Sequence, residues 1–213
     1  MTSFKYACCL LFILYFASGC STTTVKDQTG QDIQPDVVIS RIDQMSSRPD
    51  WLKESEVFKI QNGMVYSLGS TSMPVSGGVN ENALFRIAEN NAKAGLSSAI
   101  ESKLSFVFQN AEEGTGIDTT QAKFIGAEAS NLMASSLRTE KRYWERYQTH
   151  LDSGEKKVMI KVFSLVQMPE VDFKKAIIES INKRNGKGGL SAKFSDQVDK
   201  EWDKFVGNGG QGQ

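Results

Sequence analysis

The hydrophobic pattern first predicts a β-hairpin in the segment EVFKIQNGMVYSLGS. Two apolar-rich runs flank Asn62 and Gly63. An Asn-Gly pair tolerates the positive φ angles of a type I′ turn, so we expect strands over residues 56–61 and 64–71. Residues 72–79 contain proline and two glycines and are expected to end the second strand.

Helical spacing follows this hairpin. Asn80 can cap a helix over residues 81–109, in which apolar side chains recur at every fourth position. The stripe consists of Leu84, Ala88, Ala92, Leu96, Ile100 and Leu104. Its alanines allow a neighbouring element to approach closely. After a loop over residues 111–120, a second helical face is marked by Ile125, Ala129, Leu132 and Leu137.

Two strand-like runs, residues 141–150 and 156–168, then flank the turn sequence LDSGE. In the first run Tyr143 shares a face with Tyr147, and Trp144 lies on the other face. In the second run, apolar residues alternate with residues of the opposite face, the pattern of a half-buried strand. The alternating residues are Val158, Ile160, Val162 and Val166 against Lys157, Met159, Lys161 and Phe163.

A third helix is expected after Pro169, with Phe173, Ile177 and Ile181 on its apolar face. Residues 185–189 are glycine-rich and end it. The order ββααββα predicts an α+β domain over residues 35–184, in which helices pack on an antiparallel sheet of about four strands.

A second amphipathic stripe follows the glycine-rich break and continues to Phe205 or Val206. It could dock on its own domain, in a partner groove or on lipid; its polar face lacks the lysine and arginine excess that suits lipid. The weak candidates for partner binding are Leu190, Phe194, Val198 and Trp202. Within residues 185–213, the glycine- and glutamine-rich end is expected to be frayed.

The N-terminal pattern is that of a signal peptide over residues 1–19. Lys5 precedes a mostly apolar run of ten positions, residues 7–16, and small residues follow it. A membrane-spanning helix needs about 20 apolar residues, so this run is too short to span as written.

The sequence Ala17-Ser18-Gly19-Cys20 resembles the lipobox of bacterial lipoproteins, although Ala17 stands where that family usually has leucine. The resemblance implies cleavage between Gly19 and Cys20, a diacylglyceryl group on the Cys20 sulfur and acylation of the new amine. Ser21 stands where inner-membrane lipoproteins usually carry aspartate, which implies the outer membrane. The alternative is an ordinary secretory signal with a chance cysteine.

The cysteine count favours lipidation. Cys8 and Cys9 lie in the removed segment, so Cys20 is the single thiol of the mature chain and no disulfide can form within it. One acyl chain binds a membrane only marginally, whereas the three implied here would hold permanently. A covalent lipid on Cys20 is therefore expected, and no other cofactor.

Residues 21–34 are poor in large apolar side chains and are predicted to be a tether. A flexible chain of this length has a root-mean-square reach of roughly 20 Å. Lys5 is the only charge before Cys20, so the mature chain has one basic residue fewer than the full chain's 25, against 25 acidic residues, and a formal charge of −1. Such a balance does not favour nucleic-acid binding.

Residues that could carry catalysis are few. His150 is the single histidine, no GxSxG motif occurs, and a zinc site would need several thiols or imidazoles. Gly77 and Gly78 precede a helix without the Lys-Ser/Thr of a phosphate loop, and the loop pair Glu112-Glu113 is typical of solvated carboxylates. We expect neither an enzyme nor a metal site.

Several loose motifs occur in a recognisable order. They are Arg48-Pro49-Asp50-Trp51, Gly69-Ser70-Thr71, the helix with Ala88 and Ala92, and the strands of Tyr143-Trp144 and 157–168. Over residues 48–169 this series resembles the bacterial twenty-kilodalton surface-lipoprotein family. The resemblance implies a non-enzymatic role at the outer membrane and a relation to flagellar-assembly domains.

The leading hypothesis is therefore an outer-membrane lipoprotein that binds or organises another component of the cell envelope. A second hypothesis is a cell-wall or envelope hydrolase, which predicts carboxylates that converge in a cleft with raised pKa values. A third is an accessory factor for a flagellar or secretion assembly, and a partner could bind through residues 190–206.

Overall fold

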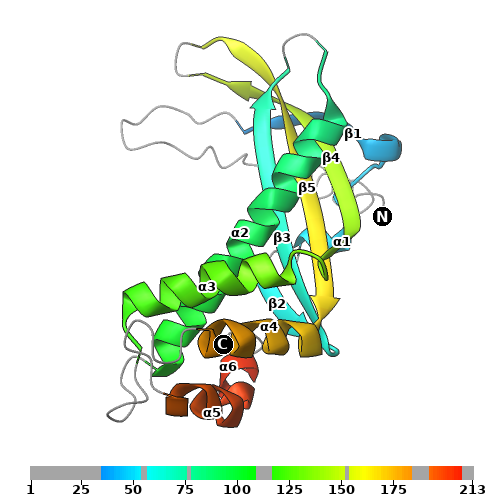
Figure 1. Ribbon diagram of the computed structural model, residues 1–213. Helices are drawn as coiled ribbons and strands as arrows, with labels where there is room; N and C mark the ends of the chain where they lie inside the picture. The colour runs from blue at the N-terminus through cyan, green and yellow to red at the C-terminus, as the bar shows by residue number, and fades with distance from the viewer. Residues whose placement is uncertain are drawn as a thin grey trace, which may run out of the picture. The chain divides into compact units, whose positions relative to one another are not determined.

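The computed structural model describes residues 35–53, 57–75, 78–108, 117–151, 154–183 and 192–207. The chain divides into two compact units, Met1–Pro35 and Asp36–Gln213, and every element described below belongs to the second. In that unit helices pack on an antiparallel sheet (Figure 1), which confirms the predicted α+β class.

The sheet has five strands in the order β1-β4-β5-β3-β2, and each neighbouring pair is antiparallel. The strands are β1 Val37–Arg41, β2 Phe58–Gln61, β3 Met64–Pro74, β4 Arg138–His150 and β5 Lys156–Pro169. About four strands were expected, and β1 is the additional one. It joins one edge of the sheet by pairing with β4.

The predicted hairpin is confirmed as β2 and β3. Asn62 and Gly63 have φ angles of 53° and 70°, as the Asn-Gly turn requires, and Gln61 pairs with Met64 across it. The expected end of the second strand at residue 71 is wrong, because β3 continues to Pro74, which pairs with Met159 of β5. The long partner strand extends the pairing into the predicted loop.

Helix α2, Glu81–Phe108, crosses one face of the sheet (Figure 1). The Asn80 side chain accepts a hydrogen bond from the Ala83 N–H at 3.1 Å, which confirms the predicted cap. The apolar stripe is buried along its length, from Leu84 to Leu104. At Gly69 of β3 a Cβ atom would lie 2.0 Å from the Ala88 carbonyl oxygen, so strand and helix backbones approach closely there.

Helix α3, Thr119–Met133, packs on α2, and helix α4, Glu170–Asn182, follows β5. Both confirm predicted helices, although Leu137 lies beyond the end of α3 rather than on its face. The Asp118 side chain caps α3 in a capping box. The backbone N–H of Glu170 donates to the Gly63 carbonyl at 2.9 Å and links α4 to the β2–β3 turn.

The C-terminal stripe forms two short helices, α5 Ala192–Lys200 and α6 Trp202–Gly207. The expectation of a single helix is wrong, because a turn at Glu201 separates them. Hydrogen bonds from Glu201 N to Gln197 O and from Phe205 N to Glu201 O continue across this turn, each at 2.9 Å, so the interruption is small.

The opposite face of the sheet is covered by the segment that follows β1, which contains the short helices η1 Ile42–Gln44 and α1 Asp50–Lys53. Leu52 packs there with Tyr143 and Phe163. Because of this cover, Phe163 is buried, and the expectation that this face of β5 is exposed is wrong at that position. Tyr143 and Trp144 lie on opposite faces as predicted, since Trp144 packs with the residues under α2.

Candidate functional site

The predicted lipidation site lies outside the described residues. Gly19 and Cys20 belong to the first unit, so cleavage and acylation there remain predictions from the sequence. Leu190 also lies outside the described residues. The structure describes the other three candidates for partner binding, Phe194, Val198 and Trp202.

Those three side chains point into the domain itself. Phe194 and Val198 have no exposed surface, and Trp202 is 7% exposed. The Phe173 ring of α4 lies 6.1 Å from the Trp202 ring and 6.3 Å from the Phe205 ring, centroid to centroid. Their packing matches the first of the three alternatives, docking on the parent domain.

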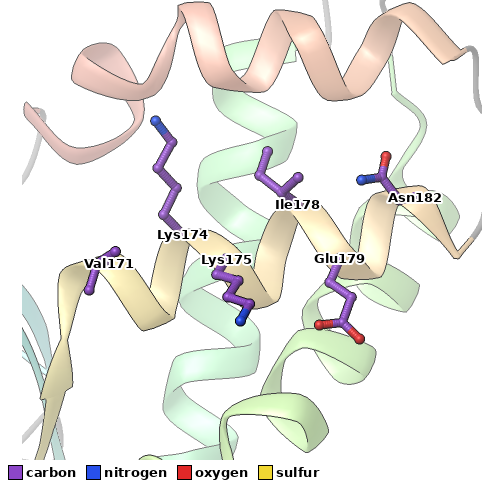
Figure 2. A pocket seen from close by; sticks show the side chains of 6 residues that line it. All are labelled: Val171, Lys174, Lys175, Ile178, Glu179 and Asn182. Carbon is purple, nitrogen blue, oxygen red and sulfur yellow. The ribbon is translucent and has the colours of Figure 1, made fainter.

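A hollow with a volume of about 480 Å³ lies along the outer face of α4 (Figure 2). It is lined by Val171, Lys174, Lys175, Ile178, Glu179 and Asn182. Val171 is 72% exposed at its first turn. The lining of the hollow is therefore mainly apolar, with charged side chains of the same helix beside it.

An ion pair and a hydrogen bond join α4 to the C-terminal helices beside this hollow. The Lys174 ammonium lies 2.6 Å from an Asp199 carboxylate oxygen and 5.2 Å from the Trp202 ring centroid. The Trp202 indole N–H donates to Glu170 at 3.0 Å. Figure 2 shows Lys174 and Ile178 directed toward the C-terminal helices, with Glu179 on the other side of α4. All six lining residues belong to α4, and the C-terminal helices lie beside the hollow on the side of Lys174 and Ile178.

An ion pair between a buried carboxylate and a half-exposed guanidinium lies on the other face of the sheet. Glu145 is 1% exposed. The single Arg48 Nε–H is shared between its two carboxylate oxygens, at 3.1 and 3.0 Å, and Arg48 Nη2 forms an ion pair with the same group. The Tyr143 hydroxyl donates to the same carboxylate at 3.1 Å. This cluster fastens the segment after β1 to the centre of β4.

Opposing effects set the pKa values in this cluster. Burial alone would raise the pKa of Glu145, but hydrogen bonds and charge from Arg48, with a hydrogen bond from Tyr143, outweigh it and lower the pKa. Burial and the adjacent Glu145 charge raise the pKa of Tyr143 to about 12. Glu145 is therefore ionised and Tyr143 is a neutral donor at neutral pH.

Sequence reasoning did not identify this cluster. Arg48 was noted only as part of an opening motif, and Glu145 is 97 residues away from it. Glu145 lies between Tyr143 and Tyr147 on one face of the strand, and this spacing is the sequence signal for an inward-pointing acid. Its partner is set by tertiary folding.

Other carboxyl groups with shifted pKa values are also paired with cations. The pKa of Asp50 is lowered by a hydrogen bond from Lys53. Burial would raise the pKa of Glu89, but hydrogen bonds from Arg142 and Thr139 and nearby cations lower it. The hydrolase hypothesis calls for raised values, and within the described ranges no carboxyl group has a resolved shift in that direction.

Two further properties concern metals and membranes. The described ranges contain no group of three or more His, Cys, Asp or Glu side chains that could hold a metal ion. None of the helices in the described part of the chain combines the length and apolarity needed to cross a membrane.

His150 is the last residue of β4 and pairs with Lys156, next to the turn as predicted.

Comparison of the chain with protein-family models and with curated proteins found no match in either set.

Proposed function

We propose that this chain is an outer-membrane lipoprotein that is anchored through lipid on Cys20 and binds or organises another component of the cell envelope without catalysis. The observation that carries the proposal is the segment Ala17-Ser18-Gly19-Cys20 at the end of a ten-residue apolar run. Removal of residues 1–19 would leave Cys20 as the first residue and the single thiol of the chain.

The boundary of the folded unit supports this arrangement. The second unit begins at Asp36, and its first strand begins at Val37. The predicted tether ends at Gln34, so anchor, tether and domain follow one another without overlap. A lipidated cysteine at the start of such a chain would keep the start of the domain at a root-mean-square distance of roughly 20 Å from the anchor.

A contact with another envelope component is supported by the hollow on α4. It combines exposed Val171 and half-buried Ile178 with charged side chains, of which Lys174 pairs with Asp199 and Glu179 with Lys183. Its place beside the β2–β3 turn puts it at the end of the sheet opposite the entry of β1. This hollow is our candidate for the contact surface.

Metabolic labelling with a fatty acid tests the anchor. Cells that produce the wild type should incorporate label into this chain, and cells that produce Cys20→Ser should not. Cys8→Ser serves as the matched control, because it removes a thiol from the segment that is cleaved and should leave labelling unchanged. Equal labelling of wild type and Cys20→Ser would refute the anchor.

A further inference from the structure

Three side chains at helical spacing lie on the outer face of α4. Ile178 and Asn182 follow Val171 by seven and eleven residues, so all three share one face of the helix. Val171 is 72% exposed, Ile178 is half-buried, and both line the hollow. The middle of this face is therefore apolar, and a helix that packed against it would cover both side chains.

The charged side chains on the two sides of this face differ in their partners. On the side of the C-terminal helices, the Lys174 ammonium lies 2.6 Å from Asp199. Figure 2 shows Lys175 and Glu179 on the opposite side, and both are exposed. Among the described residues, Lys175 has no ion-pair partner, and Glu179 pairs with Lys183 only at 3.7 Å. This side therefore offers one cation and one anion, four residues apart.

A second copy of α4 in antiparallel orientation matches this charge pattern. When a two-fold axis relates two antiparallel helices, each side of one helix meets the same side of the other. With the axis level with position 177, Lys175 lies opposite the partner's Glu179. The symmetry repeats this contact, so Glu179 lies opposite the partner's Lys175. Two complementary pairs result from one helix sequence.

The same axis aligns the apolar side chains. Position 178 is one residue past the axis in each copy, so the two Ile178 side chains are offset by about 3 Å along the helices. Val171 lies level with the partner's Asn182, whereas the two Val171 positions are about 18 Å apart. The pairing covers Val171 and Ile178 and leaves neither lysine of the hollow without an anion.

We infer that the α4 hollow binds the α4 helix of a second copy of this chain, antiparallel and about a two-fold axis. This inference rests on the proposed function, because it uses the same contact surface, and it names the partner. A parallel pair would place Lys175 level with the partner's Lys174, so two cations would meet. The charge pattern thus selects the antiparallel arrangement.

The contact between the two helices is small. A helix of 13 residues is about 20 Å long and about 10 Å wide, and a stable interface buries roughly 1,200 Å² or more in total. Attachment of both copies to one membrane would raise their effective concentration, which favours a weak pair. Pairing is therefore expected on the membrane and not in dilute solution.

Photo-crosslinking in cells tests the identity of the partner. The full chain is produced in two versions with different affinity tags, each with a photoreactive amino acid at position 178. Irradiation should give a product that contains both tags. The same amino acid at position 43, which is exposed in η1, is the control and should not give this product. A product that joins one tagged chain to a different protein would overturn the second copy as the occupant.

Introduced cysteines test the orientation. Because Cys20 is the single thiol of the mature chain, its acylation leaves an introduced cysteine as the one free thiol. In isolated membranes treated with copper phenanthroline, Ile178→Cys should form a disulfide-linked dimer. Val171→Cys and Asn182→Cys should each form little dimer alone and a mixed dimer when produced together. Equal dimer formation by Val171→Cys alone and by Ile178→Cys would overturn the antiparallel arrangement.

Charge reversal tests the ion pairs. In the Ile178→Cys chain, Lys175→Glu should reduce the dimer at least twofold, because the new carboxylate faces the partner's Glu179. Addition of Glu179→Lys should restore the dimer, since the exchanged charges are again complementary. A dimer that Lys175→Glu leaves unchanged would overturn the charge match.

The outcomes separate this inference from the anchor. A disulfide-linked dimer of the wild type would show a free thiol at Cys20 and overturn the anchor. A chain that is acylated, as seen by intact mass, and whose Ile178→Cys variant stays monomeric under the oxidant overturns the second copy alone.

Discussion

At Gly69 the backbone of β3 lies almost against the backbone of α2. A Cβ atom there would lie 2.0 Å from the Ala88 carbonyl oxygen and 2.3 Å from the Ala92 nitrogen. Neither backbone atom can move without displacing the helix. The alanines of α2 and this glycine together allow the close approach of helix and sheet.

Gly69→Ala is accordingly expected to lower the free energy of unfolding by about 3 kcal/mol, because the added methyl group overpacks the contact. Urea denaturation measures this loss. Gly78→Ala is the control, since a Cβ at Gly78 meets nothing within 4 Å, and its effect should stay within about 0.5 kcal/mol. Equal stability of the two variants would show that α2 does not pack on β3 at this point.

The Glu145 carboxylate is buried while its partner Arg48 is half exposed. Loss of Arg48 would leave a buried charge without its main partner, whereas loss of Glu145 leaves a cation that water can reach. The two ends of this ion pair are therefore not equivalent.

Arg48→Met is expected to destabilise the domain by about 3 kcal/mol at pH 7, and Glu145→Gln by less. The folded-state pKa of Glu145 is lowered, so its contribution is present above the unfolded value of about 4.3 and is lost as the pH falls through the lower, folded value. Urea denaturation of both variants and wild type between pH 7 and pH 3 checks this. A difference that is constant across that range would contradict the assignment.

Elements with local signals could be predicted from the sequence. The Asn62-Gly63 turn identified the β2–β3 hairpin, and the four-residue spacing identified α2 to within one residue at its end. The alternation in β5 and the helical face of α4 were equally local. In each case neighbouring residues contain the information, because the hydrogen bonds or the apolar face repeat within a few positions.

Elements that depend on distant partners could not be predicted. β1 has five residues and no turn signal, and it pairs with residues about 100 positions later. Helix α1 has four residues and is held by burial of Leu52 against β4 and β5. The Arg48–Glu145 pair depends on the same tertiary contact, so the sequence shows its members without their association.

The C-terminal helices are expected to be part of the folding unit. Phe194→Ala should cost about 3 to 5 kcal/mol, because the side chain is fully buried in the cluster that contains Phe173. Thermal denaturation measures this, and Asp196→Ala, at an exposed position of the same helix, should have little effect. Unchanged stability of Phe194→Ala, with loss of co-purifying proteins, would instead assign the stripe to a partner.

On the scale of the whole molecule, the two ends of the sheet have different surroundings. One end carries the start of β1, and the other carries α4 with its hollow. In the proposed function, the hollow on α4 is the surface that contacts another envelope component.

Sorting between membranes is a property of the whole lipoprotein. Ser21→Asp should move the protein from the outer to the inner membrane, because aspartate after the lipidated cysteine is the retention signal implied by the resemblance. Density-gradient separation of the membranes measures the distribution, with Ser21→Thr as the control. A Ser21→Asp protein that stays with the outer membrane would remove the basis for the proposed location.

The most direct test of the central claim is the mass of the N-terminal tryptic peptide of the native protein, which ends at Lys26. The account predicts a peptide that begins at Cys20 and carries a diacylglyceryl group on sulfur and an acyl chain on its amine. An unmodified Cys20 at the start of the chain, or a chain that retains residues 1–19, would contradict it.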